Sequence, residues 1–293
     1  MGRIGIVTEE TADLPQEIIE RNQIEIVPVI LNWPELEGLL GHNTFQKMRE
    51  LEKRGGISFG KTAQPSPQDF LERYRSSFKL FDKVLCVTLT SKLSGSYDSA
   101  LLAKSIIEPE YQEEIHIVDS LNASCGQALV VLKAIDLIES GKEVEGIAQE
   151  LQEFVPHVHL FAMLEDPKWL EASGRISHTV ANLMRGMMKL GIRPVLTFKN
   201  GALVPAGLKI RAKDIADALF KQLQSDTQHL GKSGNQIRVA ITHGDNPGGA
   251  ERLKGLIEKG LVNSEVIFVN IINNVVGAPC GPNALALAWC EMQ

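Results

Sequence analysis

Two hydroxyl side chains lie in turns that are suited to hold a carboxylate or a phosphate. Ser94 follows a strongly apolar stretch and precedes a predicted helix, and Gly95 would let a ligand approach the backbone. Thr62 belongs to the polar loop 61–67, whose prolines fix the backbone. A helix N-terminus adds unpaired N–H groups and a positive dipole end, which favour an anion. The alternative is structural: Ser94 caps a helix, and the loop is a connector that Ser66 ends with a cap.

Basic residues offer a second way to bind an anion. Lys209 and Arg211 point to the same face if 208–212 is extended, because side chains alternate along a strand. Such a pair can hold an anion, although two neighbouring cations are more often simply solvated. Arg175, within the segment 173–177, either neutralises a ligand or forms a structural ion pair with an Asp or Glu.

Catalytic patterns are weak. The segment 56–60 matches the G-x-S-x-G string of serine hydrolases, but a charged stretch precedes it and a proline loop follows, where the motif needs a strand and a helix. There is no H-E-x-x-H and no G-x-G-x-x-G. Cys280 has no evident base partner, and His243 beside Asp245 is a weak signal for a metal or a triad. We therefore expect no catalytic residue and no metal.

Composition excludes further classes. The chain has 293 residues, enough for about two domains at roughly 150 residues each, and a formal net charge of −6. An acidic chain has no general attraction for phosphate backbones, so nucleic acid is not an expected partner. No apolar run reaches the ~18 residues of a membrane-spanning helix, and the N-terminus lacks a signal-peptide pattern. Four widely spaced cysteines without a C-x-x-C pair fit a reducing, cytoplasmic location.

The first half alternates short aliphatic runs with amphipathic stretches, which predicts a parallel sheet covered by helices. In such a sheet the turns after the strands gather at the carboxyl edge, where ligands usually bind. The Ser94 turn is expected at this edge. The strands are expected at 3–7, 24–31, 84–89 and 115–118, and the helices at 94–107 and 122–139.

The second half has a different pattern of strand-like and helix-like segments, and we place a lobe boundary after residue 157. Asn200-Gly201 between two strand-like runs is a strong hairpin signal. The remaining elements are expected as strands at 157–163, 237–242 and 266–271, helices at 213–223 and 248–260, and a final helix from about Pro282.

Six motifs in order resemble those of the DegV family of bacterial fatty-acid-binding proteins. The segment 6–15 is similar to the family's opening motif, and 61–66 (Lys-Thr-Ala-Gln-Pro-Ser) is similar to its Thr-Ser-Gln-Pro-Ser loop. The segment 93–97 (Leu-Ser-Gly-Ser-Tyr) resembles its Leu-Ser-Gly-Thr-Tyr turn. The segments 118–124, 173–177 and 209–211 fit in the same order, so the resemblance covers nearly the whole chain.

The resemblance implies an α/β fold with mostly parallel sheets and a ligand site between two lobes. The DegV-type unit would span 3–290, with an N-terminal lobe at 3–157 and a C-terminal lobe at 158–290. A long-chain fatty acid such as palmitate or oleate would lie in a buried tunnel between the lobes.

The family also implies residues for the head group. A threonine and a serine hold the fatty-acid carboxylate in the family, and these positions correspond to Thr62 and Ser94. We expect Gly95 and Arg211 as further fatty-acid-binding residues.

Finally, the resemblance implies binding without catalysis. The better-understood members of the family present the fatty acid to the catalytic subunit of a separate ATP-dependent fatty-acid kinase, which phosphorylates the carboxylate to an acyl phosphate. We therefore expect no enzymatic activity and no cofactor apart from the fatty-acid ligand.

The sequence departs from the family pattern at three positions. Pro279 replaces a histidine and has no N–H to donate. Ala63 replaces a serine after the loop threonine, and Glu10 replaces a serine in the opening motif. These changes predict a weaker or different head-group site.

Two other functions remain open. The first is an enzyme, either an acyl hydrolase that uses Ser94 or a small-molecule kinase that uses the Gly-rich turns. The second is a partner-binding module with a vestigial pocket, which Pro279 and Ala63 suggest.

Overall fold

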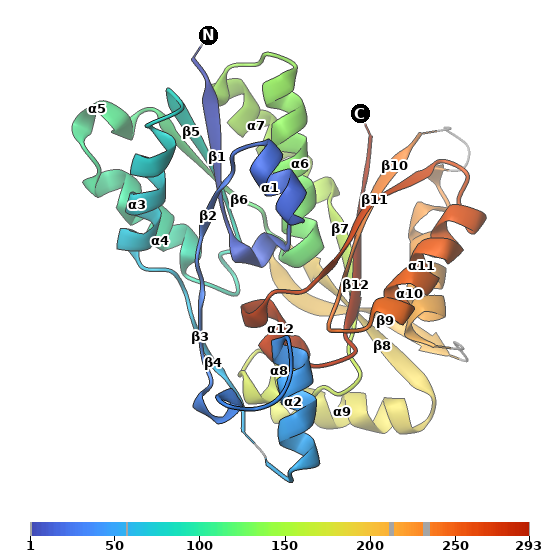
Figure 1. The fold of residues 1–293 in the computed structure, drawn as a ribbon. Helices are drawn as coiled ribbons and strands as arrows, with labels where there is room; N and C mark the ends of the chain where they lie inside the picture. Colours follow the sequence, from blue (N-terminus) through green and yellow to red (C-terminus); the bar gives the residue numbers. More distant parts are fainter. Residues whose placement is uncertain (1, 57, 211–213, 231–234, 293) are drawn as a thin grey trace. The chain divides into compact units, whose positions relative to one another are not determined.

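The chain folds into two units, each assembled from separate segments (Figure 1). The computed structural model describes residues 2–56, 58–210, 214–230 and 235–292. The first unit comprises Met1–Ile30, Ala63–Val158 and Lys199–Ala202; the second comprises Leu31–Thr62, His159–Phe198 and Leu203–Gln293.

The first unit is built on a parallel four-stranded sheet in the order β2-β1-β5-β6. The strands are β1 (Ile4–Glu9), β2 (Glu25–Val27), β5 (Lys83–Thr88) and β6 (Ile115–Asp119). Residues 84–88 are buried without interruption, as expected for a parallel strand that is covered on both faces.

Helices cover both faces of this sheet (Figure 1). On one face, α3 and α4 pack against a core that includes Val7, Val84 and Cys86, while α6 and α7 contact the sheet from the other face. The helices are α1 (Gln16–Arg21), α3 (Pro67–Ser77), α4 (Ser96–Ile106), α5 (Pro109–Gln112), α6 (Ser124–Glu139) and α7 (Val144–Phe154), with 3-10 turns at η1 (Glu10–Ala12) and η3 (Val155–His157).

The second unit is built on a six-stranded sheet in the order β11-β10-β12-β7-β8-β9. The predicted α/β class is confirmed, but the mostly parallel pairing is correct only for the first sheet: β10 pairs with β11 in parallel, whereas β10–β12, β12–β7 and β7–β8 are antiparallel. The strands are β7 (His159–Met163), β8 (Ile192–Lys199), β9 (Ala202–Ile210), β10 (Ile237–His243), β11 (Ser264–Ile271) and β12 (Leu285–Glu291).

The predicted final helix from Pro282 is wrong, because β12 takes its place. This strand lies between β10 and β7 and pairs with both, and six of its seven residues are buried. A continuous apolar run fits a buried helix and a buried strand equally well. The neighbouring strands decide the outcome, because they satisfy the backbone N–H and C=O groups of this run.

Two hydrophobic clusters fill the second unit. The first lies between the sheet and the helices α10 (Ile215–Thr227) and α11 (Pro247–Gly260) and includes Leu219, Leu253 and Trp289. The second includes Trp169 and surrounds the helices α2 (Thr44–Lys53), α8 (Lys168–Ala172), α9 (His178–Lys189) and α12 (Asn274–Cys280).

The segment 31–62 belongs to the second unit, although the predicted N-terminal lobe at 3–157 includes it. Its side chains Trp33, Phe45 and Met48 are buried in the cluster that contains Trp169, and this burial explains the assignment. The chain enters and leaves the segment through the paired strands β3 (Ile30–Asn32) and β4 (Lys61–Ala63), and η2 (Pro34–Leu36) lies within it.

Two local predictions are confirmed. Ser66 caps α3 in a capping box with Asp69, and Pro67 occupies the first helical turn. Asn200 and Gly201, which connect β8 and β9, have φ values of 50° and 79°, as a tight hairpin turn requires. Among the described residues, no helix is long and apolar enough to cross a membrane.

Candidate functional site

The Ser94 turn lies at the carboxyl edge of the parallel sheet, between β5 and α4. Ser94 is half-buried and Ser96, the first residue of α4, is fully buried. The two hydroxyl oxygens lie 2.9 Å apart, and the Ser96 N–H donates to Ser94 Oγ at 3.2 Å. The N-cap of α4 is Gly95, which has no side chain to cap the helix, so the Ser94 hydroxyl lies just before the cap at the positive end of the helix.

Gly95 is required by close packing. A Cβ atom built on Gly95 would lie 2.1 Å from Oε1 of Gln64, whose amide nitrogen donates to Ser99 Oγ at 3.2 Å. Gln64, two residues after Thr62 in the chain, therefore packs on the Ser94 turn.

Backbone and side-chain hydrogen bonds fix the same turn. Thr90 accepts the N–H groups of Leu93 and Ser94 through its carbonyl, and its hydroxyl donates to the Gly201 carbonyl at 2.9 Å. The carboxylate of Asp119, at the end of β6, accepts the N–H groups of Ser91 and Leu121. A turn held at so many points can present a hydroxyl in one direction.

Glu9, at the end of β1, lies buried beneath this turn. Its Oε2 accepts the N–H of Leu89 at 2.6 Å. Burial raises the pKa of Glu9 to about 7, although the hydrogen bond from the Leu89 N–H opposes the rise. The carboxyl therefore titrates near neutral pH at a buried sheet edge.

Thr62, in β4, belongs to the second unit, where it meets Arg175. Nη2 of Arg175 donates to Thr62 Oγ1 at 3.1 Å. Burial lowers the pKa of the guanidinium, but an arginine remains charged. Sequence reasoning favoured an acidic partner for Arg175, whereas its side-chain hydrogen bond goes to a hydroxyl.

The end of α8 explains how Arg175 reaches this position. Gly174 has a φ of 73°, its N–H donates to Glu171 O, and the N–H of Arg175 donates to Leu170 O. These two bonds form a Schellman motif, in which only glycine adopts the positive φ without strain. The motif ends α8 and changes the direction of the chain, so Arg175 does not continue the helix.

The structure therefore describes Ser94 and Gly95 together in the first unit and Thr62 in the second. Arg211 lies outside the described residues, and Lys209 is at the end of β9. Pro279, which stands where the family has a histidine, is buried within α12. Cys280 is half-buried and acts to raise the pKa of Arg175, against the larger effect of burial.

Two sequence patterns, one of nucleotide-binding proteins and one of serine hydrolases, lie in elements that do not suit their chemistry. Residues 55–62 (Gly-Gly-Ile-Ser-Phe-Gly-Lys-Thr) match the phosphate-loop string G-x-x-x-x-G-K-[ST], which requires a strand before it and a helix after it. Here the helix α2 precedes the string, and Lys61 and Thr62 lie in the strand β4. The G-x-S-x-G string at 56–60 lies in the same wrong context.

His243 and Asp245 have structural roles in the turn between β10 and α11. His243 Nδ1 accepts the N–H of Asn246 at 3.1 Å, and Asp245 forms an ion pair with Arg49. Among the described residues, no group of three or more His, Cys, Asp or Glu side chains could hold a metal ion.

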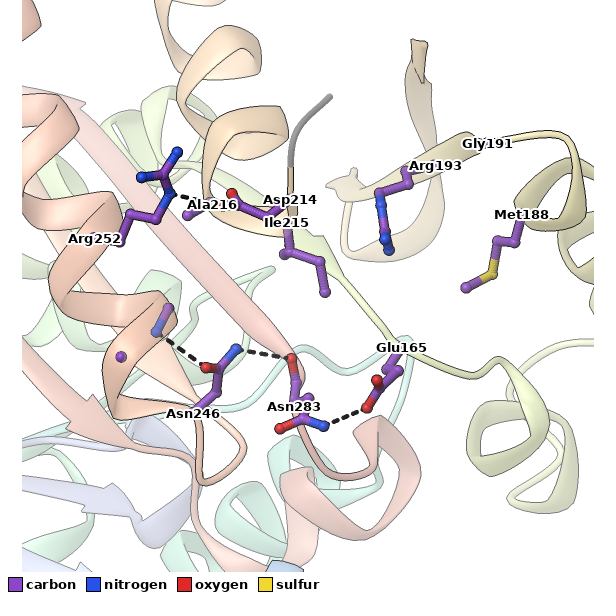
Figure 2. Close-up of a pocket in the computed structure, with 12 residues that line it drawn as sticks. Glu165, Met188, Gly191, Arg193, Asp214, Ile215, Ala216, Asn246, Arg252 and Asn283 are labelled. Carbon is purple, nitrogen blue, oxygen red and sulfur yellow. Dashed lines mark hydrogen bonds and ion pairs between the residues drawn. The ribbon is translucent and has the colours of Figure 1, made fainter. Parts of the chain in front are cut away.

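A pocket of about 570 Å³, lined by both charged and apolar residues, lies in the second unit (Figure 2). Arg252 pairs with Asp214 at 2.7 Å, and Asn283 donates to Glu165. Figure 2 shows the Arg193 side chain directed toward the open part of the pocket. None of Thr62, Ser94 and Gly95 lines it.

The fold and the Ser94 turn define an α/β protein that presents hydroxyl and N–H groups at the carboxyl edge of a parallel sheet. The family model described as "Uncharacterised protein, DegV family" matches residues 3–292, and the chain belongs to the DegV family.

Individual relatives match over almost their full length. A DegV domain-containing protein of Clostridium perfringens is 33% identical, with 99% of each chain covered. A Thermotoga maritima protein named fatty acid-binding protein is 30% identical, with 97% of this chain and 96% of the relative covered. A solved structure of a DegV family protein from Thermus thermophilus, described as showing fatty acid binding, has 27% identity, a TM-score of 0.81 and coverage of 99% and 100%.

Proposed function

We propose that this protein binds a long-chain fatty acid such as palmitate or oleate in a buried tunnel. The observation that carries the proposal is the 30% identity, over nearly the whole chain, to a protein named for fatty-acid binding. The hydroxyl turn at Ser94 supports it, because the positive end of a helix suits a carboxylate.

In this proposal, Thr62 and Ser94 donate hydrogen bonds to the fatty-acid carboxylate. Gly95 lets Gln64 pack closely beside Ser94, and Gln64 is two residues from Thr62 in the chain. Arg175 adds a positive charge at Thr62, and Arg211 remains a proposed further contact.

The hydrocarbon chain supplies most of the affinity. Burial of a methylene contributes ~0.8 kcal/mol, so ~14 of them contribute roughly 11 kcal/mol before the costs of binding. A hydrogen bond to a charged head group contributes only ~1.5–3 kcal/mol. The hydroxyls therefore fix the orientation of the ligand more than its affinity.

The proposed role is to present the carboxylate to the catalytic subunit of a separate fatty-acid kinase. There a carboxylate oxygen would attack the γ-phosphorus of ATP, giving an acyl phosphate and ADP. The protein with ATP alone should yield no acyl phosphate. Addition of the kinase subunit should yield a product that hydroxylamine traps as a hydroxamate. Product formation without that subunit would instead favour the small-molecule kinase.

Extraction tests the binding proposal directly. Denatured, purified protein should release close to one equivalent of fatty acid, identified by mass spectrometry. Consistent absence of lipid, together with no uptake of added palmitate or oleate, would contradict it and favour the partner-binding module with a vestigial pocket. Turnover of an acyl ester would favour the hydrolase.

Substitutions test the head-group residues. Ser94→Ala and Thr62→Ala should each weaken oleate binding by about 1–3 kcal/mol. Ser105→Ala, an exposed serine on the same helix α4 as the Ser94 turn, is the matched control and should bind like the wild type. Unchanged affinity in both site variants would remove Thr62 and Ser94 from the site.

A further inference from the structure

The pocket of about 570 Å³ in the second unit is lined by none of the described residues that we propose for the fatty-acid head group (Figure 2). Its volume is in the range of pockets that take up a small molecule. The lining includes the apolar side chains of Met188, Ile215 and Ala216 as well as four charged side chains. A ligand that fits this lining therefore has an apolar portion and charged groups.

Two of the four charged side chains neutralise each other. Nε of Arg252, on α11, lies 2.7 Å from Oδ2 of Asp214. The other carboxylate oxygen of Asp214 accepts the N–H of Asp217 and so caps α10. The charges that remain in the lining are those of Arg193 and Glu165.

Arg193 offers an unpaired positive charge. It is the second residue of β8, and the next two residues, Pro194 and Val195, are buried, which fixes the strand at this point. Of the other residues that the structure describes, none forms an ion pair or a hydrogen bond with its guanidinium. Figure 2 shows the side chain directed toward the open part of the pocket. Its planar fork of donors suits a carboxylate.

Glu165 offers an unpaired negative charge. The amide nitrogen of Asn283 donates to its carboxylate, and Oδ1 of the same amide accepts from Nη2 of Arg49 at 2.9 Å. An arginine can only donate and an ionised carboxylate can only accept, so both partners fix the amide, and the amide holds Glu165. No Lys, Arg or His within the described ranges forms an ion pair with Glu165.

The two unpaired charges do not neutralise each other. Figure 2 shows Arg193 reaching into the pocket from β8, and Glu165 below it in the view with its carboxyl directed toward Asn283. A plain anion in the pocket would meet the like charge of Glu165, and a plain cation would meet that of Arg193. A molecule with one carboxylate and one ammonium satisfies both.

We propose that this pocket binds a zwitterion with an apolar side chain, as provided by an aliphatic α-amino acid or a short peptide. Arg193 binds its carboxylate, Glu165 binds its ammonium, and its apolar portion contacts Met188 and Ile215. The first turns of α10 and α11 also line the pocket, and their positive ends add to the attraction for the carboxylate. The inference goes beyond the proposed function and does not depend on it.

Calorimetric titration of the whole chain with L-leucine and with L-leucyl-L-leucine tests for the site. We expect saturable binding of one equivalent of at least one of them. Tighter binding of leucine would support a free amino acid as the ligand, and tighter binding of the dipeptide would support a peptide. Absence of saturable binding of both at millimolar concentrations would overturn the inference.

Derivatives that lack one charge test the need for a zwitterion. The amide of the tighter ligand lacks the carboxylate, and its N-acetyl form lacks the ammonium. The wild type should bind each derivative roughly tenfold more weakly or worse, because one charge of the pocket then stays unpaired. Equal affinity for the ligand and both derivatives would overturn the proposal.

Two substitutions test the assigned partners. Arg193→Gln and Glu165→Gln should each weaken binding of the zwitterion by roughly tenfold. Arg193→Gln should not weaken binding of the amide, and Glu165→Gln should not weaken binding of the N-acetyl form. Arg21→Gln and Glu17→Gln, at exposed residues of α1, are the matched controls and should bind like the wild type. Site variants that bind like these controls would overturn the assignment.

Gly248→Glu fills the pocket from the first turn of α11. A Cβ on Gly248 would meet nothing within 4 Å, and a carboxylate is favourable at a helix start, so the variant should fold. It should lose binding of the zwitterion. Gly255→Glu is the matched control, because this glycine of α11 is equally open but does not line the pocket. Retained binding in Gly248→Glu would place the ligand elsewhere and overturn the inference.

Oleate separates this site from the proposed function. Gly248→Glu should bind oleate like the wild type, and oleate should not displace the zwitterion. If oleate displaces it and Gly248→Glu also loses oleate binding, the pocket belongs to the fatty-acid site and the inference fails. If the zwitterion binds while no oleate binds and no lipid is extracted, the proposed function fails and this inference stands.

Discussion

The guanidinium of Arg175 donates a hydrogen bond to the Thr62 hydroxyl, with 3.1 Å between Nη2 and Oγ1. The two residues are 113 positions apart in the chain. Within the described part of the chain the guanidinium forms no ion pair, so its remaining N–H groups suit an anion at the same place. It makes Thr62 part of a charged site rather than an isolated hydroxyl.

Arg175→Met should weaken oleate binding by roughly tenfold, because it removes the positive charge and the donors beside Thr62 while it keeps an apolar stem. Equilibrium titration with oleate provides the measurement. Arg21→Met, at an exposed arginine that ends α1, should bind like the wild type. Equal affinity of Arg175→Met and Arg21→Met would show that Arg175 only supports the loop.

Gly95→Ala should destabilise the protein by about 1 kcal/mol, because the new Cβ displaces the Gln64 side chain and breaks its hydrogen bond to Ser99. Denaturant unfolding measures the change. The effect should disappear in a Gln64→Ala background, where nothing remains to displace. Gly146→Ala, in the first turn of α7 where a Cβ would meet nothing within 4 Å, should instead stabilise by roughly 0.5–1 kcal/mol.

Glu9→Gln should stabilise the folded protein in mildly alkaline solution. The pKa of Glu9 rises on folding from 4.5 to about 7, so the folded state binds more protons than the unfolded state in this interval. The stability of the wild type therefore falls as the pH rises from about 4.5 to about 7, and it stays low above that. The variant lacks this loss and should gain about 2–3 kcal/mol at pH 8 relative to pH 5.

Urea unfolding at pH 5 and pH 8 checks this prediction. Glu17→Gln is again the control, because its exposed carboxyl should give the same difference as the wild type at both values. A gain in Glu9→Gln that is identical at pH 5 and pH 8 would contradict the raised pKa and point to packing instead.

Asp245→Ala should destabilise the second unit by about 2–3 kcal/mol, because Asp245 pairs with Arg49, accepts from Asn43 and has a φ of 53°. Asp245→Asn tolerates the same backbone and should lose less, about 1–2 kcal/mol. Burial raises the pKa of Asp245, but hydrogen bonds from Asn43, Arg49 and Gln46 outweigh it and lower the pKa overall.

That lowered pKa gives the pH dependence its sign. The ion pair is present above the ordinary carboxyl pKa of 3.8 and is lost as the pH falls through the lower pKa of the folded state. The difference in unfolding free energy between the wild type and Asp245→Asn should therefore shrink in acid. A difference that is constant from pH 7 to pH 3 would exclude the ion pair as its source.

Features decided by a few adjacent residues could be predicted from the sequence. The capping box needs only Ser66 and Asp69, and the hairpin needs only Asn200 and Gly201. The parallel sheet of the first unit follows from its regular alternation of strands and helices. In β12 the local pattern fits two structures, and only the pairing with β7 and β10 selects a strand.

In the candidate site, too, features set by adjacent residues could be predicted and those set by distant segments could not. The Ser94 turn could be placed from its neighbours in the chain, whereas the contact of Arg175 with Thr62 depends on segments far apart. The burial of Glu9 could not be predicted, because it depends on the strands β1, β5 and β6 meeting at one edge. A carboxylate at the end of a strand was the signal, but exposed and buried carboxylates look alike in a sequence.

The segment 31–62 has a consequence for biosynthesis. It emerges from the ribosome early, yet its Trp33, Phe45 and Met48 share a core with Trp169, Leu196 and Ala284, which are translated much later. Until then these apolar side chains lack their native cover, and nascent chains are open to aggregation and to chaperone capture. A gene truncated before residue 159 would leave that stretch permanently exposed, so neither half of the coding sequence encodes a self-sufficient product.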